Sequence, residues 1–304
     1  MAASAGAGNA TRGNAQGAAG AVGSGKGGSG GGTLSSALFY VFLFLFVLVS
    51  VAPLLWVFKM SIVQKSEVTA TPPTILPQSF TGQSYSTIFS DASFQKALIN
   101  SIIIAGVTTV VCLFFGAIAA YAIARLRFNF KNLVMTLILA ISFFPAVAII
   151  APLFIQFRAI GLINTYWSAI IADTVFALPL TIWILVSFFK ELPPDLEEAA
   201  KIDGATTLQA FRKVIVPLAA PGVFTTAILT FIFAWNEFLF AATFLYEESV
   251  QPVTVRIPNF ATVYTVDYGA QAAAAVVVTV PLVILVLIFQ RRIVSGLTAG
   301  AVKG

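Results

Sequence analysis

Residues Leu196–Gly222 read LEEAAKIDGATTLQAFRKVIVPLAAPG, and the rest of the chain is interpreted outward from this polar stretch between two apolar ones. Acidic residues in its first turn favour a helix start, and Gly204 can adopt the left-handed conformation that ends one. Thr206 and Gln209 have the spacing of a capping box, and Pro217 is expected to end the second helix. The stretch therefore predicts a helical hairpin.

The first helix of this hairpin has one apolar side made mostly of small residues. Leu196, Ala199 and Ala200 fall at positions i, i+3 and i+4, so they share a helix face. Small side chains allow another surface to approach the backbone closely. This pattern favours a hairpin shaped to fit a cleft in another protein.

The composition is that of an integral membrane protein. Of 304 residues, 59% are hydrophobic and 10% are charged, with a mean hydropathy of +0.95. Soluble chains carry about a quarter charged residues. The net charge of +5 could suggest nucleic acid or anionic lipid, but the placement of the charges indicates membrane topology instead.

Six apolar segments each approach the roughly 20 residues that a membrane-spanning helix needs. They predict an all-α polytopic fold with six transmembrane helices. Pro145, Pro152 and Pro179 lie within them and are interpreted as ordinary helix bending. The expected spans are Ala37–Phe58, Leu98–Ala124, Leu133–Ile155, Tyr166–Phe189, Val223–Leu245 and Ala272–Phe289.

The N-terminal segment, residues 1–34, is rich in Gly, Ala and Ser and is expected to be a disordered cytoplasmic head. Gly20–Lys26 matches the first seven positions of a phosphate-binding loop, but Gly27 stands where the magnesium-binding hydroxyl is required. We therefore attribute the match to chance in a Gly-rich tract. The head also lacks the features of a signal peptide.

The basic residues set the expected orientation. If the head is cytoplasmic, twelve of the 17 Lys and Arg residues fall on the inside, and the short Arg125–Lys131 loop is the clearest case. Both termini and the hairpin are then cytoplasmic. The longer loops Lys59–Ala97 and Tyr246–Gln271 face outside.

The residue types that are missing exclude most chemistry. The chain has no His, which removes the usual catalytic triads, most zinc sites and the commonest general base. A single Cys112 excludes an intrachain disulfide. We predict no catalytic residue and no metal site.

Several motifs together resemble one family. The hairpin is similar to the cytoplasmic EAA loop of ABC-importer permeases, and the resemblance to their carbohydrate branch, the second permease subunit of maltose and trehalose importers, covers about Ser35–Gly304. It implies a permease domain at 35–294, with a coupling loop at 193–222, and a cytoplasmic tail at 295–304. The matching residues are Glu198-Ala199-Ala200, Asp203-Gly204-Ala205, Gln209-Ala210-Phe211, Pro217-Leu218, Trp235-Asn236-Glu237 and the run Gly296–Gly304.

The resemblance implies that the hairpin docks in a cleft of a separate ATPase subunit dimer. ATP and magnesium would be bound by that partner and not by this chain. Glu198 would pair with a basic residue of the ATPase, since an unpaired interfacial charge is costly. The tail would reach into the interface of the ATPase dimer. The expected coupling residues are Glu198, Ala199, Ala200, Asp203, Gly204 and Ala205.

Polar groups at membrane depth suggest a translocation pathway. Ionisable residues there are costly and are often functional, and a sugar also needs aromatic faces, which Trp235, Phe144 and Phe233 could supply. The alternative is that these groups join helices to one another. In the maltose relatives, the resemblance places the defined sugar site mainly on the partner permease. The candidates are Asn100, Asp173, Trp235, Asn236 and Glu237.

The outer loop Tyr246–Gln271 carries aromatic and acidic residues suited to a protein contact. By resemblance it would contact an extracytoplasmic solute-binding protein, and a solvated loop is the alternative. The candidates are Tyr246, Glu247, Tyr264 and Tyr268.

Together these observations give one hypothesis. The chain would be half of a heterodimeric pore in a bacterial or archaeal cytoplasmic membrane. It would import an oligosaccharide such as maltose or trehalose. ATP and the loaded binding protein would stabilise the same state of the pore, which is what coupling of ATP hydrolysis to transport requires. A permease for glycerol phosphate or a polyol, an ion-coupled secondary carrier and a membrane enzyme are the alternatives.

Overall fold

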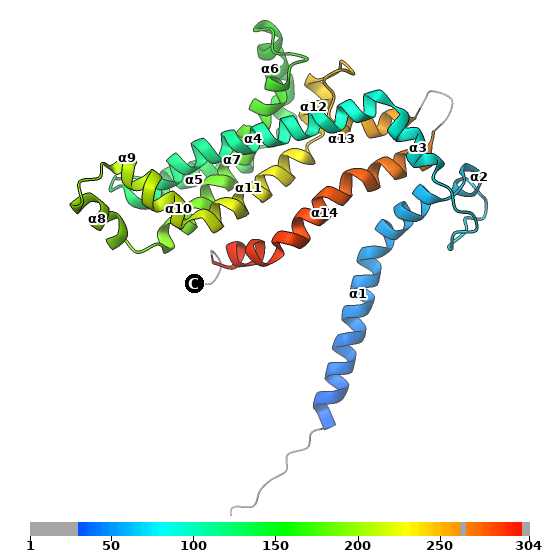
Figure 1. Ribbon diagram of the computed structural model, residues 1–304, viewed down its shortest axis with the longest axis horizontal. Coiled ribbons are helices and arrows are strands. Elements are labelled where there is room, and N and C mark those ends of the chain that lie inside the picture. Colours follow the sequence, from blue (N-terminus) through cyan, green and yellow to red (C-terminus); the bar gives the residue numbers. More distant parts are fainter. Residues whose placement is uncertain (1–29, 262–265, 300–304) are drawn as a thin grey trace, which may run out of the picture. The chain divides into compact units, whose positions relative to one another are not determined.

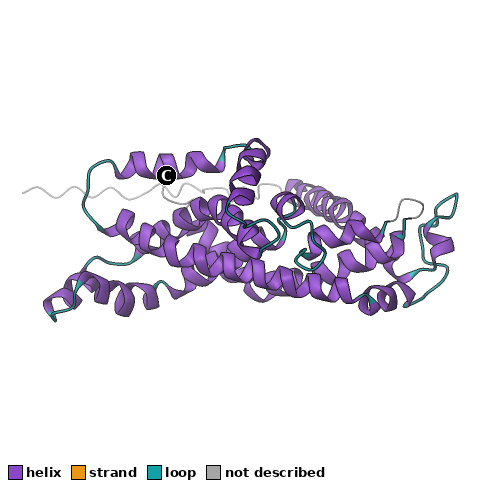
Figure 2. Ribbon diagram, turned by 90° about the horizontal axis from the view of Figure 1, so that it is seen from above, coloured by secondary structure: helices purple, strands orange, loops and turns teal. Residues whose placement is uncertain are grey.

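The computed structural model describes residues 30–261 and 266–299. The regular structure of these residues is helical (Figure 2). They contain no β-strand, and one isolated antiparallel β-bridge joins Ala261 to Val266. The predicted all-α class is therefore confirmed. Most of the predicted N-terminal head, Tyr264 and the last five residues lie outside the described residues. Residues 1–52 and 53–304 form two separate units.

Four helices are long and apolar enough to cross a bilayer without interruption: α1 (Gly30–Ile62), α4 (Ala92–Arg125), α7 (Tyr166–Glu191) and α14 (Tyr268–Ala299). Two bent pairs raise the number of candidate spans in the described chain to six. The first pair contains the third predicted segment, and the second pair, Thr207–Leu218 with Ala220–Trp235, covers only the first part of the fifth predicted segment.

The third predicted span is broken in the middle. α5 (Lys131–Ser142) and α6 (Ala146–Ala159) meet at an angle of 87° (Figure 1). Pro145 has no N–H to donate and disfavours a helical conformation at the residue before it, so the helix ends there. Our interpretation of Pro145 as ordinary helix bending is wrong.

The fifth predicted span is also discontinuous. α11 (Ala220–Trp235) ends before Asn236, and the short helix α12 (Leu239–Phe244) follows it. Glu237 lies in the gap and accepts hydrogen bonds from the backbone N–H groups of Phe240 and Ala241, at 2.8 and 3.0 Å. These N–H groups have no partner within α12, so the carboxylate stabilises the start of that helix.

The centre of the bundle is formed by α4, α7 and α11, which pack against one another (Figure 1). Gly116 on α4 lies against Thr181 of α7, where a Cβ would come within 2.7 Å of the Thr181 methyl group. Thr181 in turn is hydrogen-bonded to Thr230 of α11 at 2.9 Å. Gly116 therefore marks a place where α4 and α7 approach each other closely.

Short helices complete the two loops that the sequence predicts to face outside, called the outer loops below. Asp91 caps α4 by accepting from Ser93, and its carboxylate pairs with Arg256 at 2.9 Å. Arg256 also pairs with Glu248 at 2.7 Å, so one guanidinium holds the two loops together. The short outer helices are α2 (Lys65–Val68), α3 (Gln83–Ser90), α13 (Val253–Arg256) and η2 (Ile257–Phe260).

Candidate functional site

The predicted hairpin consists of four short helical segments: α8 (Asp195–Ile202), α9 (Thr207–Ala210), the π-helix η1 (Phe211–Ile215) and α10 (Val216–Leu218). Gly204 has φ +89°, the left-handed conformation that the sequence predicts. The Thr206–Gln209 capping box is complete. Helical structure continues past Pro217 to Leu218, so our expectation that Pro217 ends the helix is wrong.

The chain bends by 77° at Ala219, between the hairpin and α11. The π-helical turn before Pro217 changes the hydrogen-bond register of the backbone, because the Val216 N–H donates to the carbonyl of Phe211, five residues back. Pro217, which has no N–H to donate, is thereby accommodated at the start of α10. The hairpin is thus joined to the spanning helix α11 by a single residue.

Glu197 fixes the hairpin to the bundle. Its side chain is buried, and its Oε1 accepts hydrogen bonds from the Tyr121 hydroxyl and from Lys201 Nζ, both at 2.7 Å. Arg125 Nε lies 4.0 Å from Oε2. Tyr121 and Arg125 belong to the last turns of α4, so one carboxylate connects the first hairpin helix to the end of a spanning helix.

Electrostatics keeps Glu197 ionised. Burial alone would raise the pKa of its carboxyl, but the hydrogen bonds from Lys201 and Tyr121 outweigh it, and the charges of Lys201 and Arg125 act in the same direction. The net effect is a pKa below the ordinary value for glutamate. The anchoring contact is therefore a charged one at neutral pH.

Aromatic packing reinforces this anchor. Phe211 of η1 lies against Tyr121, with ring centroids 4.8 Å apart, and edge-on to Phe189 of α7 at 6.2 Å. Arg125 donates to the carbonyl of Leu192 at 2.7 Å, which holds the segment leading into α8. A movement of the hairpin would therefore be passed directly to α4 and α7.

Most of the predicted coupling residues lie on the solvent-exposed side of the hairpin. Glu198, Ala199, Asp203 and Gly204 are exposed, and Ala200 and Ala205 are partly buried. Glu198 is therefore exposed to solvent, while its neighbour Glu197 is buried in the anchor.

Sequence reasoning missed three residues of the hairpin. Ile202 is 86% exposed and Leu208 is 71% exposed, so the hairpin carries two exposed apolar side chains. The third is Glu197, whose only sequence signal is its i,i+4 spacing to Lys201.

A second candidate site is an apolar groove of about 580 Å³, referred to below as the break groove. It lies where the α5–α6 break and the α11–α12 break face each other. It brings together Asn236, Glu237 and two of the three predicted aromatic residues, Phe144 and Phe233. Its lining residues are Ser142, Phe144, Ala146, Phe176, Ile232, Phe233, Asn236, Glu237, Phe238, Leu239 and Phe240.

Asn236 and Glu237 differ in what they can offer a ligand. The Asn236 side chain is exposed and donates one hydrogen bond to the carbonyl of Ile232 at 2.7 Å. One N–H and the amide oxygen remain without a partner among the described residues. Both carboxylate oxygens of Glu237 are already used in capping α12.

The structure separates the other predicted pathway residues from this groove. Trp235 is buried and stacks on Phe231 with ring centroids 5.6 Å apart. Asp173 is buried beside a separate cavity of about 10 Å³, which Glu237 also lines. Asn100 lies in the N-terminal part of α4 and bonds to the carbonyls of Ser249 and Gln251 and to the Tyr166 hydroxyl. Asn100 thus joins helix and loop, the alternative reading for these polar groups.

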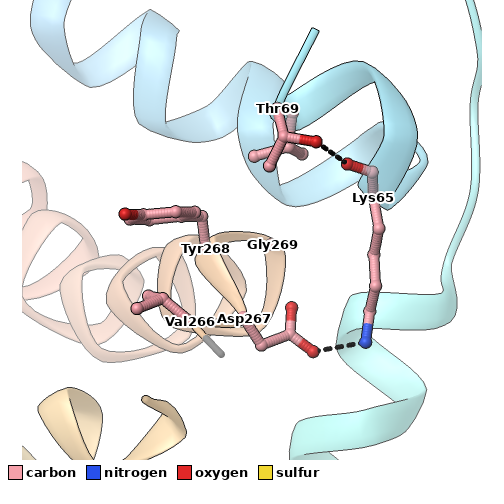
Figure 3. A pocket seen from close by; sticks show the side chains of 7 residues that line it. Lys65, Thr69, Val266, Asp267, Tyr268 and Gly269 are labelled. Carbon is pink, nitrogen blue, oxygen red and sulfur yellow. Dashed lines mark hydrogen bonds and ion pairs between the residues drawn. The ribbon is translucent and has the colours of Figure 1, made fainter. Parts of the chain in front are cut away.

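In the loop predicted to face outside, Tyr246, Glu247 and Tyr268 are exposed, and Tyr264 lies outside the described residues. Glu247 accepts from Asn164 at 3.1 Å. A cavity of about 290 Å³ lies beside Tyr268, and its lining includes Lys65 and Asp267, which form an ion pair of 2.6 Å (Figure 3). The two outer loops therefore meet at the start of α14.

Glu67 organises the first outer loop. Its carboxylate accepts from the Ser79 hydroxyl at 2.7 Å, from the backbone of Gln78 and Ser79, and from Thr74, and it pairs with Lys59 at 3.4 Å. These hydrogen bonds, led by that of Ser79, lower the pKa of Glu67 to about 2. In this loop, the Glu67 carboxylate thus accepts from backbone N–H groups that a helix or sheet would otherwise pair with carbonyls.

This gives a pH-dependent prediction. Because the folded pKa of Glu67 is depressed, its contribution to loop stability is complete above about pH 4.5 and is lost as the pH falls toward 2. Amide hydrogen exchange of residues 64–81 should therefore lose protection in that window. Glu67→Gln should exchange faster at neutral pH and lose this pH dependence. Equal protection of variant and native loops at neutral pH would contradict the assignment.

Comparison with known proteins places these features in a family. Residues 112–298 match the model of the binding-protein-dependent transport system inner membrane component. The chain belongs to this family. It is therefore a multi-pass membrane transport component rather than an enzyme, and the predicted ABC-importer permease resemblance is confirmed.

The relatives include several sugar transporters. The trehalose transport permease SugB of Mycobacterium tuberculosis is 49% identical, covering 83% of this chain and 92% of that protein. The sulfoquinovosyl glycerol permease SmoH of Agrobacterium fabrum is 42% identical over 83% and 88%. The trehalose/maltose permease MalG of Thermococcus litoralis is 38% identical over 86% and 94%. The chain is accordingly a permease of the carbohydrate branch.

A solved structure shares the fold. One chain of a bacterial ABC transporter that imports the acidic polysaccharide alginate matches with a TM-score of 0.75 and 25% identity, covering 86% of this chain and 98% of that one. This agreement supports the type I importer fold. The carrier and enzyme alternatives have no support from these comparisons.

Proposed function

We propose that this chain is one pore-forming half of an ATP-driven, binding-protein-dependent importer of a neutral oligosaccharide such as trehalose or maltose. The observation that carries the proposal is the anchored hairpin. Its Glu197 is buried against Tyr121 and Arg125 of α4, whereas Glu198 and Ile202 of the same helix are exposed to solvent. A hairpin fixed on one side and open on the other suits a mechanical connection between subunits.

In this proposal the other half of the pore is a second permease subunit. A separate ATPase dimer binds ATP and magnesium and grips the exposed side of the hairpin, while an extracytoplasmic solute-binding protein delivers the sugar. Both termini lie in the cytosol, which agrees with the distribution of basic residues. Closure of the ATPase dimer moves α8, and the Glu197 contact passes this movement to α4.

The relatives favour trehalose over the other solutes. The relatives cited above transport trehalose, trehalose or maltose, and sulfoquinovosyl glycerol, and the one with the highest identity of these three is the trehalose permease. A permease for glycerol phosphate or a polyol remains the alternative, because the hairpin motif is common to the family.

Expression of the whole transport operon tests the proposal. We expect the affinity-tagged chain to co-purify with an ATPase and a second permease. Reconstituted in liposomes with the binding protein, it should accumulate radiolabelled trehalose only when ATP is supplied to the ATPase side. Accumulation driven by an ion gradient without ATP, or purification as a lone chain, would contradict the proposal.

A further inference from the structure

The break groove has a feature that the family assignment does not explain. Two spanning segments lose their helical structure, and both breaks, at Phe143–Pro145 and at Asn236–Phe238, line the same groove. Within a bilayer, non-helical backbone is tolerated only where it is buried in protein or lines a polar cavity. Because two breaks meet in this groove, we expect that the groove does not face lipid.

The depth of the breaks agrees with a transport route. α5 has 12 residues and α11 has 16, which correspond to about 18 and 24 Å of helix. The hydrocarbon core is about 30 Å thick, so both breaks lie within it. The groove thus opens at a depth that any transported solute must pass.

The lining suits a sugar. Phe144 is 53% exposed, Phe238 is 47% exposed and Phe233 is 40% exposed, while Phe176 and Phe240 pack together behind them with ring centroids 5.3 Å apart. Aromatic faces stack against the C–H faces of a sugar ring, and a few polar groups then fix its orientation.

The polar groups of the lining indicate the charge of the ligand. Asn236 offers a free N–H and an amide oxygen to sugar hydroxyls. The lining includes no Lys or Arg, and Glu237 is its only ionisable member. An anionic solute would find no countercharge on this wall and a carboxylate nearby, which disfavours it.

We infer that this chain itself contacts the transported solute in the break groove, and that the groove selects a neutral saccharide through Phe144, Phe233 and Asn236. This rests on the proposed function and deepens it, because it assigns the substrate class to residues of this chain. The aromatic side chains hold the ring faces, and Asn236 exchanges hydrogen bonds with hydroxyl groups as the sugar passes.

Photo-cross-linking identifies the occupant. The photoreactive p-benzoylphenylalanine is placed at position 144 of the complete transporter in nanodiscs, with loaded binding protein and radiolabelled trehalose. We expect a sugar adduct that excess unlabelled trehalose removes at least tenfold better than an equal excess of a glucuronic-acid disaccharide. An adduct with lipid or with the second permease alone, or no sugar adduct in a transport-competent complex, would overturn the inference.

Transport measurements provide a matched comparison. Phe233→Ala and Asn236→Ala should lower trehalose uptake at least tenfold while subunit association and binding-protein-stimulated ATP hydrolysis are retained. Phe224 lies on the same helix, is 55% exposed and is not part of the groove, so Phe224→Ala should leave uptake within twofold. Equal uptake by all three variants would overturn the inference. Loss of ATPase association in the native chain would instead count against the proposed function.

Discussion

Replacement of Glu198 by Lys is expected to abolish association with the ATPase and to reduce sugar uptake at least 100-fold, with membrane insertion unchanged. The Glu198 side chain is exposed on the hairpin, away from the buried anchor, and Ile202 beside it is 86% exposed. In a contact that excludes water, bringing like charges together costs several kcal/mol, and 1.4 kcal/mol corresponds to a tenfold change in affinity.

Co-purification of the ATPase with the tagged permease measures this effect directly. Glu191→Lys is the matched control, because Glu191 is an exposed glutamate at the end of α7, outside the hairpin. It should leave association unchanged. Normal uptake by the Glu198→Lys variant would remove the docking role from the hairpin, and equal losses in both variants would indicate a general effect of charge near the membrane.

The second large effect is expected at Glu197. Glu197→Ala leaves Tyr121 and Lys201 without their shared acceptor and removes the carboxylate that lies 4.0 Å from Arg125 Nε. Breaking a buried ion pair costs about 3–5 kcal/mol, and the lower end applies here because the Lys201 side chain is 43% exposed. The hairpin should detach from α4, and uptake should fall more than tenfold while the exposed docking surface remains intact.

A series of variants separates the anchor from the docking surface. Tyr121→Phe removes one hydrogen bond, worth about 1 kcal/mol, and should cause a clearly smaller loss of uptake than Glu197→Ala. ATP hydrolysis measured with and without loaded binding protein provides the second readout, and Glu197→Ala should weaken that stimulation. If Glu197→Ala transported sugar like the native chain, α4 would not be the element that receives the movement of the hairpin.

The depressed pKa of Glu197 fixes the pH range of this anchor. Its stabilising contribution is complete above the ordinary glutamate pKa and is lost as the pH falls through the lower folded value. Uptake measured at neutral and mildly alkaline pH should therefore show no titration of this contact.

The amino-acid sequence by itself determined the features that depend on local chemistry. Apolar runs of bilayer length located the spans, because only helices satisfy backbone groups in lipid. Gly204 and the Thr206–Gln209 pair predicted the turn and the second helix start, since a left-handed turn and a capping box involve only neighbouring residues. The EAA motif then identified the family, which a match over residues 112–298 confirmed.

The tertiary structure decided which of two adjacent glutamates is buried. Glu197 meets Tyr121, 76 residues away in the sequence, and no local pattern encodes that distance. The same applies to Asn100, which bonds to a loop about 150 residues later and is therefore part of the scaffold. The tertiary structure also decided that the breaks before Pro145 and after Trp235 line one groove, because helix packing alone brings those two positions together.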